Sequence, residues 1–374
     1  MASDRDNFEI AIICALPLEA TAVSTIFEKG SEDTGNGESS SGTGKAAGDI
    51  NTYTVGKVGS HNVVLVHMPG MGKIPAAAVA VSLKQSFKNI KLALVVGICG
   101  GVPGEGAEGI MLGDVVVGKQ VVHYDFGRQF ENVFIRKDSP EDGLGRQGSE
   151  IRGFIRKLEA GREALDKRTN EFLAPMLQPW SAEKINNLQD ILYPADYWHI
   201  HQKTKANCIG QRCQNGVEVC ESALTSSCEE LGCDQDELVR PADPRPRPKI
   251  HFGSVASGDK VVKSATFRDN VARRDGVIAF DMEAAGVWEY LPCILIKGVC
   301  DYADSHKNKS WQEYAAITAA AFTKAVVERW SQSDQPTDRQ PAKYQVKNQF
   351  NNYNSKIGNQ ADRVVFNGNP TLSF

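Results

Sequence analysis

Four apolar segments that lie far apart in the chain end in glycines or acidic residues, and they constrain the fold more than any other feature. They end at Ala15-Leu-Pro-Leu-Glu19, Val96-Gly-Ile-Cys-Gly-Gly101, Phe280-Asp-Met-Glu-Ala-Ala285 and Ile296-Lys-Gly-Val-Cys-Asp301. Near-continuous apolar runs are typical of buried parallel strands. Open α/β sheets place their sites at the carboxyl ends of such strands. We therefore expect an α/β fold that gathers Glu19, Glu283 and Asp301 around one site, with Val96–Gly101 forming a glycine turn.

The totals of the sequence limit what the chain is expected to bind. Its 374 residues suffice for one large domain or two small ones, and its net charge of -4 gives no general reason to expect binding to nucleic acid or to a membrane. No apolar run approaches the ~20 residues of a membrane span. The first residues lack the apolar segment of a signal peptide. We therefore expect a cytoplasmic protein that keeps its nine cysteines as thiols.

The order of apolar and polar segments predicts one α/β domain over residues 1–330, with an insertion at about 129–248. Within the insertion, the spacing of apolar residues predicts a helix over Arg152–Leu173 and a second over Trp180–Leu192. A proline-rich connector ends the insertion, and the strand–turn–helix pattern resumes at Ile250. Residues 331–343 are expected to form a solvated linker, and residues 344–374 an asparagine-rich tail.

Five cysteines of the insertion raise the question of a zinc site. Their spacings are C-x4-C, C-x6-C, C-x7-C and C-x4-C, without any CxxC pair, and this favours the absence of a metal. The cysteines are Cys208, Cys213, Cys220, Cys228 and Cys233. A sixth cysteine, Cys99, lies among glycines. We expect it to be a small buried residue rather than a thiol nucleophile, because no partner base is evident in the sequence.

Three segments of the last third of the domain carry a resemblance to a known family. They are Ile250-His-Phe-Gly-Ser-Val-Ala-Ser-Gly-Asp259, Phe280-Asp-Met-Glu-Ala-Ala-Gly286, and Lys297-Gly-Val-Cys-Asp-Tyr-Ala-Asp304 with the Ser-His-Lys-Asn-Lys-Ser-Trp that follows. With them, Phe8 to Trp330 resembles the nucleoside phosphorylase/nucleosidase superfamily, and more narrowly the N-terminal effector domains of fungal NLR-type proteins. The resemblance implies a three-layer αβα sandwich with a central mixed, twisted sheet. It also implies a homo-oligomer, no metal and no organic cofactor.

The resemblance also implies roles for individual residues. Asp301 matches the acid that protonates purine N7, Glu283 the acid that binds the ribose hydroxyls, Met282 the methionine packed against the sugar, and Glu19 the glutamate that activates water. Asp304 is an alternative to Asp301. Glu19 has a structural alternative, because acids suit the first turn of a helix. The remaining substrate-binding positions are Gly72, Lys73, Cys99, Gly100, Gly101, Ser257, Val261 and Lys307.

The chemistry implied by these roles is cleavage of the N-glycosidic bond of a purine nucleoside or nucleotide. A leaving purine needs an acid that holds its proton, and burial of Asp301 beside Val299 and Cys300 favours this. Where phosphorylases carry two arginines and a serine for phosphate, this chain has Glu19, Val95 and Ile98. Water is therefore the expected nucleophile. A phosphate-dependent phosphorylase and an inactive nucleotide-binding module remain alternatives.

The expected substrate is an adenine nucleotide, with ATP first, because the resemblance is to defence and cell-death effectors. Lysines, an arginine and a histidine near the expected site are candidates to hold a triphosphate: Lys73, Lys260, Lys263, Arg268, His306, Lys307 and Lys309. The tail segment Gly358–Asn369 is similar to short amyloid motifs of fungal NLR systems. An NLR-type receptor is therefore one expected partner of the tail, and ordinary disorder is the alternative.

Overall fold

The computed structural model describes residues 4–28, 44–104, 109–202, 220–239 and 247–331, all within a single unit, Met1–Gln332. The predicted tail with its amyloid-like motif, nearly all of the linker, most of the proline-rich connector, and Cys208 and Cys213 lie outside the described residues.

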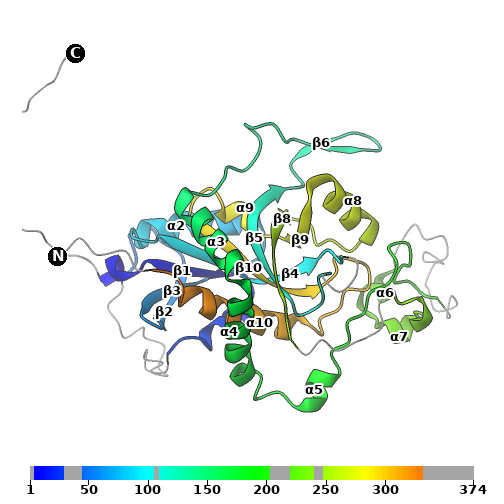
Figure 1. Ribbon diagram of the computed structural model, residues 1–374. Helices are drawn as coiled ribbons and strands as arrows, with labels where there is room; N and C mark the ends of the chain where they lie inside the picture. Colours follow the sequence, from blue (N-terminus) through cyan, green and yellow to red (C-terminus); the bar gives the residue numbers. More distant parts are fainter. Residues whose placement is uncertain (1–3, 29–43, 105–108, 203–219, 240–246, 332–374) are drawn as a thin grey trace, which may run out of the picture. The chain divides into compact units, whose positions relative to one another are not determined.

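A mixed sheet of eight strands occupies the centre of the described domain (Figure 1). At one edge, β2 (Thr52–Val58) pairs antiparallel with β3 (His61–His67). Next comes β1 (Ile10–Cys14), which is parallel to both β3 and β4 (Leu92–Gly101). Every residue of β1 is buried, as its unbroken apolar run predicted for a strand covered on both faces.

The other half of the sheet curves until it closes on itself. From β4 the pairing continues through β10 (Cys293–Asp301), β5 (Val115–His123), β8 (Ile250–Ser257) and β9 (Val277–Asp281), and β9 pairs again with the end of β4. Only this last pairing and that of β10 with β5 are antiparallel within the ring. Closure therefore brings the ends of three strands together. A separate small hairpin joins β6 (Gly127–Gln129) to β7 (Phe134–Arg136).

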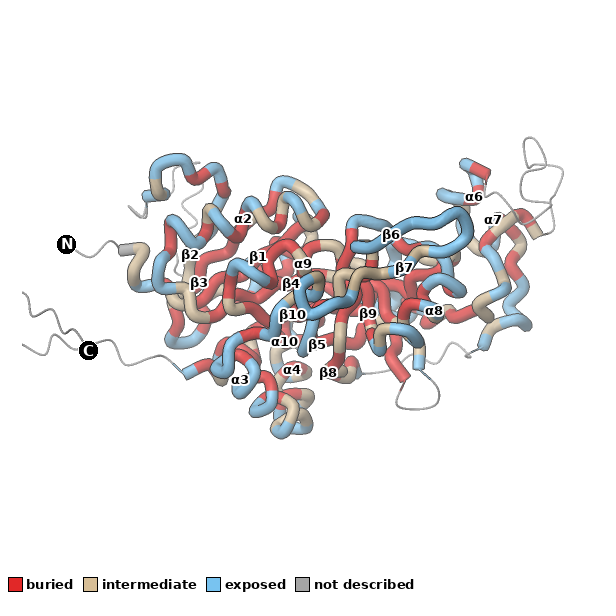
Figure 2. The backbone as a smooth tube through the Cα atoms, turned by 90° about the horizontal axis from the view of Figure 1, so that it is seen from above, coloured by how far each residue is buried: buried red, intermediate tan, exposed pale blue. Residues whose placement is uncertain are grey.

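Helices cover both faces of the sheet, so the described domain has three layers (Figure 1). One face packs against α1 (Pro17–Ser24), α3 (Ser149–Ala160), α4 (Arg162–Met176) and α10 (Gln312–Val327). The opposite face packs against α2 (Lys73–Ser86) and the short α9 (Ala284–Val287). Figure 2 shows the central strands almost wholly buried and the β6 hairpin exposed. The mixed α/β fold with a central sheet confirms the fold predicted from the sequence.

The predicted insertion divides into two parts in the structure. Helices α3 and α4 belong to the main core, whereas the cysteine-bearing part has a small apolar cluster of its own. That part contains α5 (Ala182–Asn186), α6 (Glu221–Thr225), α7 (Cys228–Leu231) and the 3₁₀ turn η5 (Gln235–Glu237). Outside the insertion, η1 (Asp4–Asn7) precedes β1, and α8 (Ala265–Asp275) precedes β9. None of the helices in the described residues is long and apolar enough to cross a membrane.

Two predicted helices differ from the observed ones. The single helix expected over Arg152–Leu173 is two helices, α3 and α4, which meet at Gly161. Glycine is among the least favourable residues in a helix interior, and Gly161 is both the last cap of α3 and the first cap of α4. The helix expected over Trp180–Leu192 is confined to α5, which Ser181 caps by accepting the N–H of Lys184. Beyond α5 the chain follows an irregular path, because its apolar residues pack in two different clusters. Leu188 belongs to one cluster and Tyr193 to the other.

Candidate active site

The strand register places the three predicted acids near one point, Gly100 of β4. Gly100 pairs with Phe280 of the antiparallel β9 on one side and with Asp301 of the parallel β10 on the other. Glu283 follows β9 by two residues, and Glu19 follows β1, the neighbour of β4. The acids are therefore brought to one place by strand pairing between residues that are nearly 200 positions apart in the sequence.

A cavity of about 210 Å³ lies at this point. Glu19, Glu283 and Asp301 all line it, as the sequence led us to expect. Among the other predicted positions, Met282, Cys99, Gly100, Val261 and Lys307 line the cavity as well. The remaining lining residues are Leu16, Met71, Ile98, Lys260, Val262, Phe280, Asp281, Cys300, Ala303 and Gln312.

The carboxylate of Glu19 is held by backbone donors on two elements. Oε2 accepts the N–H groups of Ala15 and Leu16, both at 2.9 Å, and Oε1 accepts the N–H of Ile98 at 2.9 Å. The bond from Leu16 is that of a helix-capping glutamate. Glu19 therefore does have the structural role at the helix start that was named as its alternative. A carboxylate offers about four acceptor positions, which leaves room for a ligand. Burial raises the pKa of Glu19, and Lys297 opposes this rise.

Two glycines of β4 make room for these carboxylates. A Cβ atom at Gly97 would collide with the carboxylate of Glu19, and one at Gly100 would lie 2.9 Å from Oδ1 of Asp301. Neither glycine has a positive φ. The prediction of a glycine turn over Val96–Gly101 is therefore wrong. The strand continues to Gly101, and the glycines allow side chains of neighbouring elements to approach the backbone closely.

A buried lysine, which the sequence analysis missed, connects Glu283 to a further acid. The Nζ atom of Lys297 lies 3.0 Å from Oε2 of Glu283 and 3.2 Å from Oδ2 of Asp281, and only 1% of Lys297 is exposed. The sequence did hold a signal. Lys297 interrupts the apolar run of β10, and a lysine in a buried strand needs a charged partner.

The charges of this buried group depend on one another. Burial alone would lower the pKa of Lys297, but Glu283, Asp281 and Glu19 raise it well above its ordinary value, so the ammonium stays charged. Burial raises the pKa of Asp281, and Lys297 opposes the rise. Asp281 also accepts the N–H of Ala284 at 3.2 Å, at the first residue of α9. Lys297, which pairs with both Asp281 and Glu283, therefore fixes the position of the Glu283 carboxylate.

Asp301 has three donors around its carboxylate. Lys307 lies 3.0 Å from Oδ2, the thiol of Cys300 donates to Oδ2 at 3.2 Å, and the N–H of Ala303 donates to Oδ1 at 2.8 Å. Ala303 has a φ of 51°, a strained conformation for a residue with a side chain. Burial of Asp301 agrees with the expectation from the sequence.

Asp304, the alternative acid, faces away from the main cavity. It is buried, its Oδ1 accepts the N–H of His306 at 3.0 Å, and burial raises its pKa. It lines a smaller void on the far side of Asp301 and Lys307. Asp301 is therefore the acid that shares a cavity with Glu19 and Glu283. Cys99 is buried, and burial raises the pKa of its thiol, which disfavours the thiolate that a nucleophile needs.

Four predicted substrate-binding positions do not line the cavity. Gly72 precedes α2, and Gly101 pairs with Ala279. The hydroxyl of the buried Ser257 accepts the N–H of Ala285, behind the segment that carries Glu283. Lys73 forms an ion pair with Asp125 at 2.7 Å, outside the cavity. For these four positions, contact with a substrate stays a prediction.

The cations expected to hold a triphosphate are dispersed in the structure. Only Lys260 and Lys307 line the cavity among the candidates, all of which lie in the described residues. Arg268 is buried, and its guanidinium donates to the carbonyl oxygen of Tyr302 at 2.8 Å. His306 is also buried, and burial lowers its pKa to about 4. It is therefore neutral at pH 7 and offers no charge to a phosphate.

Comparison with known proteins shows what this chain is similar to. A model of the phosphorylase superfamily matches residues 9–171. A nucleotide-binding leucine-rich repeat (NLR)-like protein of Hyaloscypha variabilis is 30% identical over 332 residues, which cover 86% of this chain and 29% of that protein. A 5'-methylthioadenosine/S-adenosylhomocysteine nucleosidase of Exiguobacterium sp. is 30% identical over 97 residues, covering 24% of this chain and 42% of the relative. The chain thus spans less than half the length of either relative.

Solved structures show the same fold. The 5'-methylthioadenosine/S-adenosylhomocysteine nucleosidase of Helicobacter pylori aligns with a TM-score of 0.50 and 15% identity, covering 87% of this chain and 99% of that one. The corresponding nucleosidase of Streptococcus pneumoniae aligns with a TM-score of 0.50 and 17% identity, covering 86% and 100%. The resemblance to the phosphorylase superfamily that was inferred from the motifs is thereby confirmed.

Proposed function

We propose that this protein hydrolyses the N-glycosidic bond of a purine nucleoside or nucleotide. The observation that carries the proposal is the convergence of Glu19, Glu283 and Asp301 on one cavity, from three different strand ends. Two relatives with the same fold are named as nucleosidases of 5'-methylthioadenosine and S-adenosylhomocysteine, whose base is adenine. A purine is therefore the base that we propose for this chain.

In the proposed mechanism, each acid has one task. Glu19 accepts a proton from a water molecule, which attacks the anomeric carbon. The bond from that carbon to the purine nitrogen breaks, its electron pair passes to the base, and Asp301 donates a proton to N7. The products are the free purine and ribose, or the free purine and the ribose phosphate when the substrate is a nucleotide. The raised pKa of Glu19 suits this task, because a general base is most effective when its pKa approaches the working pH.

Glu283 accepts hydrogen bonds from the ribose hydroxyls in this mechanism. Its negative charge then lies near the oxocarbenium-like carbon, where positive charge develops in the transition state. Lys297 holds Oε2 of Glu283 at 3.0 Å, so the carboxylate is positioned before the substrate enters. Met282, which also lines the cavity, packs against the sugar.

Water is favoured over phosphate by the charges around the cavity. Four acids line it, Glu19, Asp281, Glu283 and Asp301, whereas the lining cations among the described residues are Lys260 and Lys307. Lys307 is already paired with Asp301. Among the described residues that line the cavity there is no arginine, the side chain that usually binds a phosphate ion through paired hydrogen bonds.

We further propose that the substrate is an adenine nucleotide, with ATP the first compound to test, and that the protein acts in defence or cell death. The similarity to an NLR-like protein supports this choice. Lys260, which is exposed at the cavity, is the cation best placed to contact a phosphate chain. Assembly into homo-oligomers and recruitment by an NLR-type receptor through the tail belong to the same proposal.

A chromatographic product screen tests the proposal. The purified chain is incubated with ATP, adenosine and methylthioadenosine, with and without phosphate, alongside Asp301→Asn, Glu283→Ala and the exposed control Asp138→Asn. We expect free adenine without phosphate, a loss of at least about 100-fold in Asp301→Asn, and wild-type rates in the control. A strict requirement for phosphate would show a phosphorylase. Binding without turnover of any compound would show a nucleotide-binding module.

A further inference from the structure

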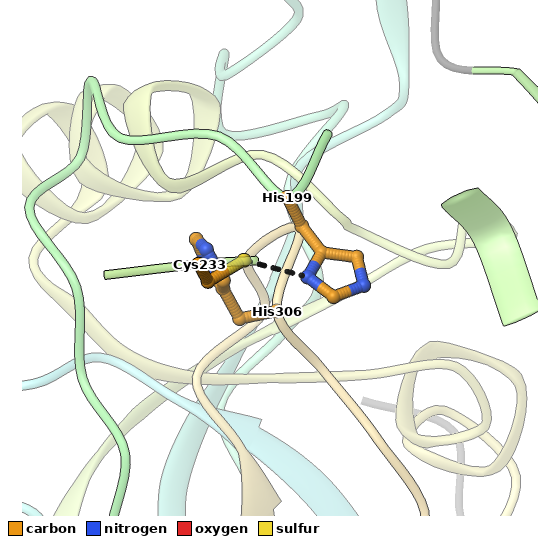
Figure 3. Close-up of side chains that lie close together, drawn as sticks. All are labelled: His199, Cys233 and His306. Carbon is orange, nitrogen blue, oxygen red and sulfur yellow. Dashed lines mark hydrogen bonds between the residues drawn. The ribbon is translucent and has the colours of Figure 1, made fainter. Parts of the chain in front are cut away.

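Two thiols and two imidazoles converge in the cysteine-bearing part of the insertion, outside the candidate active site. Three buried residues each offer one atom that could bind a metal, and these three atoms lie within 4.8 Å of one another (Figure 3). The residues are His199, Cys233 and His306. Cys228 lies beside this group, and its Sγ is 3.6 Å from Nδ1 of His199, the same distance as the Sγ of Cys233. We call these four residues the Cys₂His₂ cluster.

The orientation of His199 is that of a metal ligand. Its Nε2 lies 2.9 Å from the carbonyl oxygen of Ser226, which can only accept a hydrogen bond, so Nε2 carries the proton. Nδ1 then presents a lone pair to the sulfurs of Cys228 and Cys233. Histidines that bind a metal usually donate their other ring N–H in this way to a carbonyl or carboxylate.

The distances agree with tetrahedral zinc coordination. With Zn–S of about 2.3 Å and Zn–N of about 2.05 Å at a tetrahedral angle, a sulfur and a nitrogen bound to one ion are about 3.6 Å apart. Both sulfur-to-nitrogen distances at His199 are 3.6 Å. A single neutral Nδ1 offers only one lone pair as acceptor. The two thiols therefore cannot both donate to it, whereas coordination of a common ion accounts for both distances at once.

Local backbone structure explains how a C-x4-C spacing serves here. The short helix α7 begins at Cys228 and ends at Leu231, and Gly232, which follows it, has a left-handed φ of 71°. This turn brings the N–H of Cys233 to 2.8 Å from the carbonyl oxygen of Cys228. The two thiols therefore lie near each other without a CxxC pair. The spacing argument also missed the cluster because its histidines come from positions 199 and 306, outside the run of cysteines.

His306 supplies the second, independent observation. It is 6% exposed, and its buried Nε2 has no hydrogen-bond partner among the described residues. Its ring stacks on Tyr193 with centroids 4.2 Å apart, which fixes the plane of the ring beside the thiols. A buried ring nitrogen without a partner costs free energy, and coordination of a metal ion would satisfy it.

We propose that the Cys₂His₂ cluster of His199, Cys228, Cys233 and His306 binds one Zn²⁺ ion as a structural site. Four protein ligands would leave no open position for catalysis. The ion would anchor the segment that follows β10, because His306 directly precedes Lys307, which pairs with Asp301. The backbone N–H of His199 already donates to the hydroxyl of Ser305 at 3.0 Å, so the same two segments are in contact without the ion.

The first test measures metal in the full-length chain, purified under reducing conditions from zinc-supplemented medium without chelators. Zinc per chain is determined by mass spectrometry for the wild type, the double variant Cys228→Ser/Cys233→Ser, and Cys293→Ser, a buried cysteine of the core. We expect the double variant to hold one zinc fewer per chain than the wild type, and Cys293→Ser to equal the wild type. Equal zinc in the wild type and the double variant would overturn the proposal.

A second test does not depend on how well the variants fold. The wild-type chain is stripped of metal with a chelator, reduced and titrated with Co²⁺. We expect thiolate-to-cobalt charge-transfer absorption together with the intense visible bands of tetrahedral cobalt, and a higher midpoint of thermal unfolding on addition of Zn²⁺. If the reduced chain shows neither the absorption nor the stabilisation, the proposal is overturned. This holds even if the two cysteines form a disulfide when the chain is later oxidised.

Discussion

Replacement of the buried Lys297 by methionine is the sharpest test of how the site is held together. The side chain of Lys297 is 2% exposed and lies between two buried carboxylates, at 3.0 Å from Glu283 and 3.2 Å from Asp281. Methionine fills a similar volume without charge. Lys297→Met therefore removes the positive charge between these two carboxylates and leaves both acids buried beside each other.

The expected cost follows from these distances. At an effective dielectric constant of about 20, each attraction is worth about 5 kcal/mol before desolvation is counted. Relief of the desolvation of Lys297 offsets part of this loss. Removal of one partner of a buried ion pair costs about 3–5 kcal/mol in measured cases, so we expect the free energy of unfolding to fall by about 4 kcal/mol.

The cost should depend on pH in a defined direction. Burial raises the pKa of Asp281, and loss of Lys297, which now opposes the rise, raises it further. A carboxyl group whose pKa is higher in the folded state destabilises the fold as pH rises above its unfolded value, here 3.8. The difference in unfolding free energy between wild type and Lys297→Met should therefore be larger at pH 7 than at pH 5.

Urea unfolding at the two pH values measures this difference. Lys119→Met is the matched control, because Lys119 pairs with Glu159 at 2.9 Å on the surface, where such a pair is worth about 0–1 kcal/mol. Adding Asp281→Asn and Glu283→Gln to Lys297→Met should recover part of the loss, since no buried charge then remains in the group. A cost no larger than that of the control, or one that is the same at both pH values, would refute the reasoning.

Three further predictions concern the proposed active site and its support. Gly97→Ala should reduce turnover at least about tenfold, because its Cβ would displace the Glu19 carboxylate; Gly153→Ala, with open space around its Cβ, should leave steady-state rates unchanged. The acidic limb of the pH profile of kcat/KM should have its midpoint above 4.5, because burial raises the pKa of Glu19 from that value; a midpoint below 4.5 would contradict its role as base. Tyr302→Phe removes a 2.6 Å hydrogen bond to the buried Asp190. The free energy of unfolding in urea should fall by about 1.5–3 kcal/mol, and an unchanged unfolding midpoint would contradict this.

Much of the fold was predictable from the sequence because burial on both faces of a sheet requires apolar runs. Every residue of β1 and β10 is buried, and both strands are apolar apart from Lys297 and Asp301 in β10, so each could be located without knowing its neighbours. Acids and glycines at the strand ends were also visible, since they interrupt those runs. The family motifs carried the rest of the sequence prediction, including the three acids that line one cavity.

The boundary between α3 and α4 is a feature that the apolar pattern of the sequence did not predict. The apolar spacing on the two sides of Gly161 suits one long helix, yet α3 and α4 pack as separate helices in the core. The role of the β4 glycines was likewise misread as a turn. It depends on the carboxylates of Glu19 and Asp301, which reach the strand from other elements.

The sequence by itself determined where the strands lie and which acids end them, because these features depend on residues close together in the chain. Only the tertiary structure decided which side chains meet. The pairing of Lys297 with Asp281 and Glu283, and the approach of His306 to His199 and Cys233, both follow from the way distant segments are brought side by side. Hydrogen bonds and ion pairs act over a few ångströms, so such contacts depend on strand register and packing, which no local pattern records.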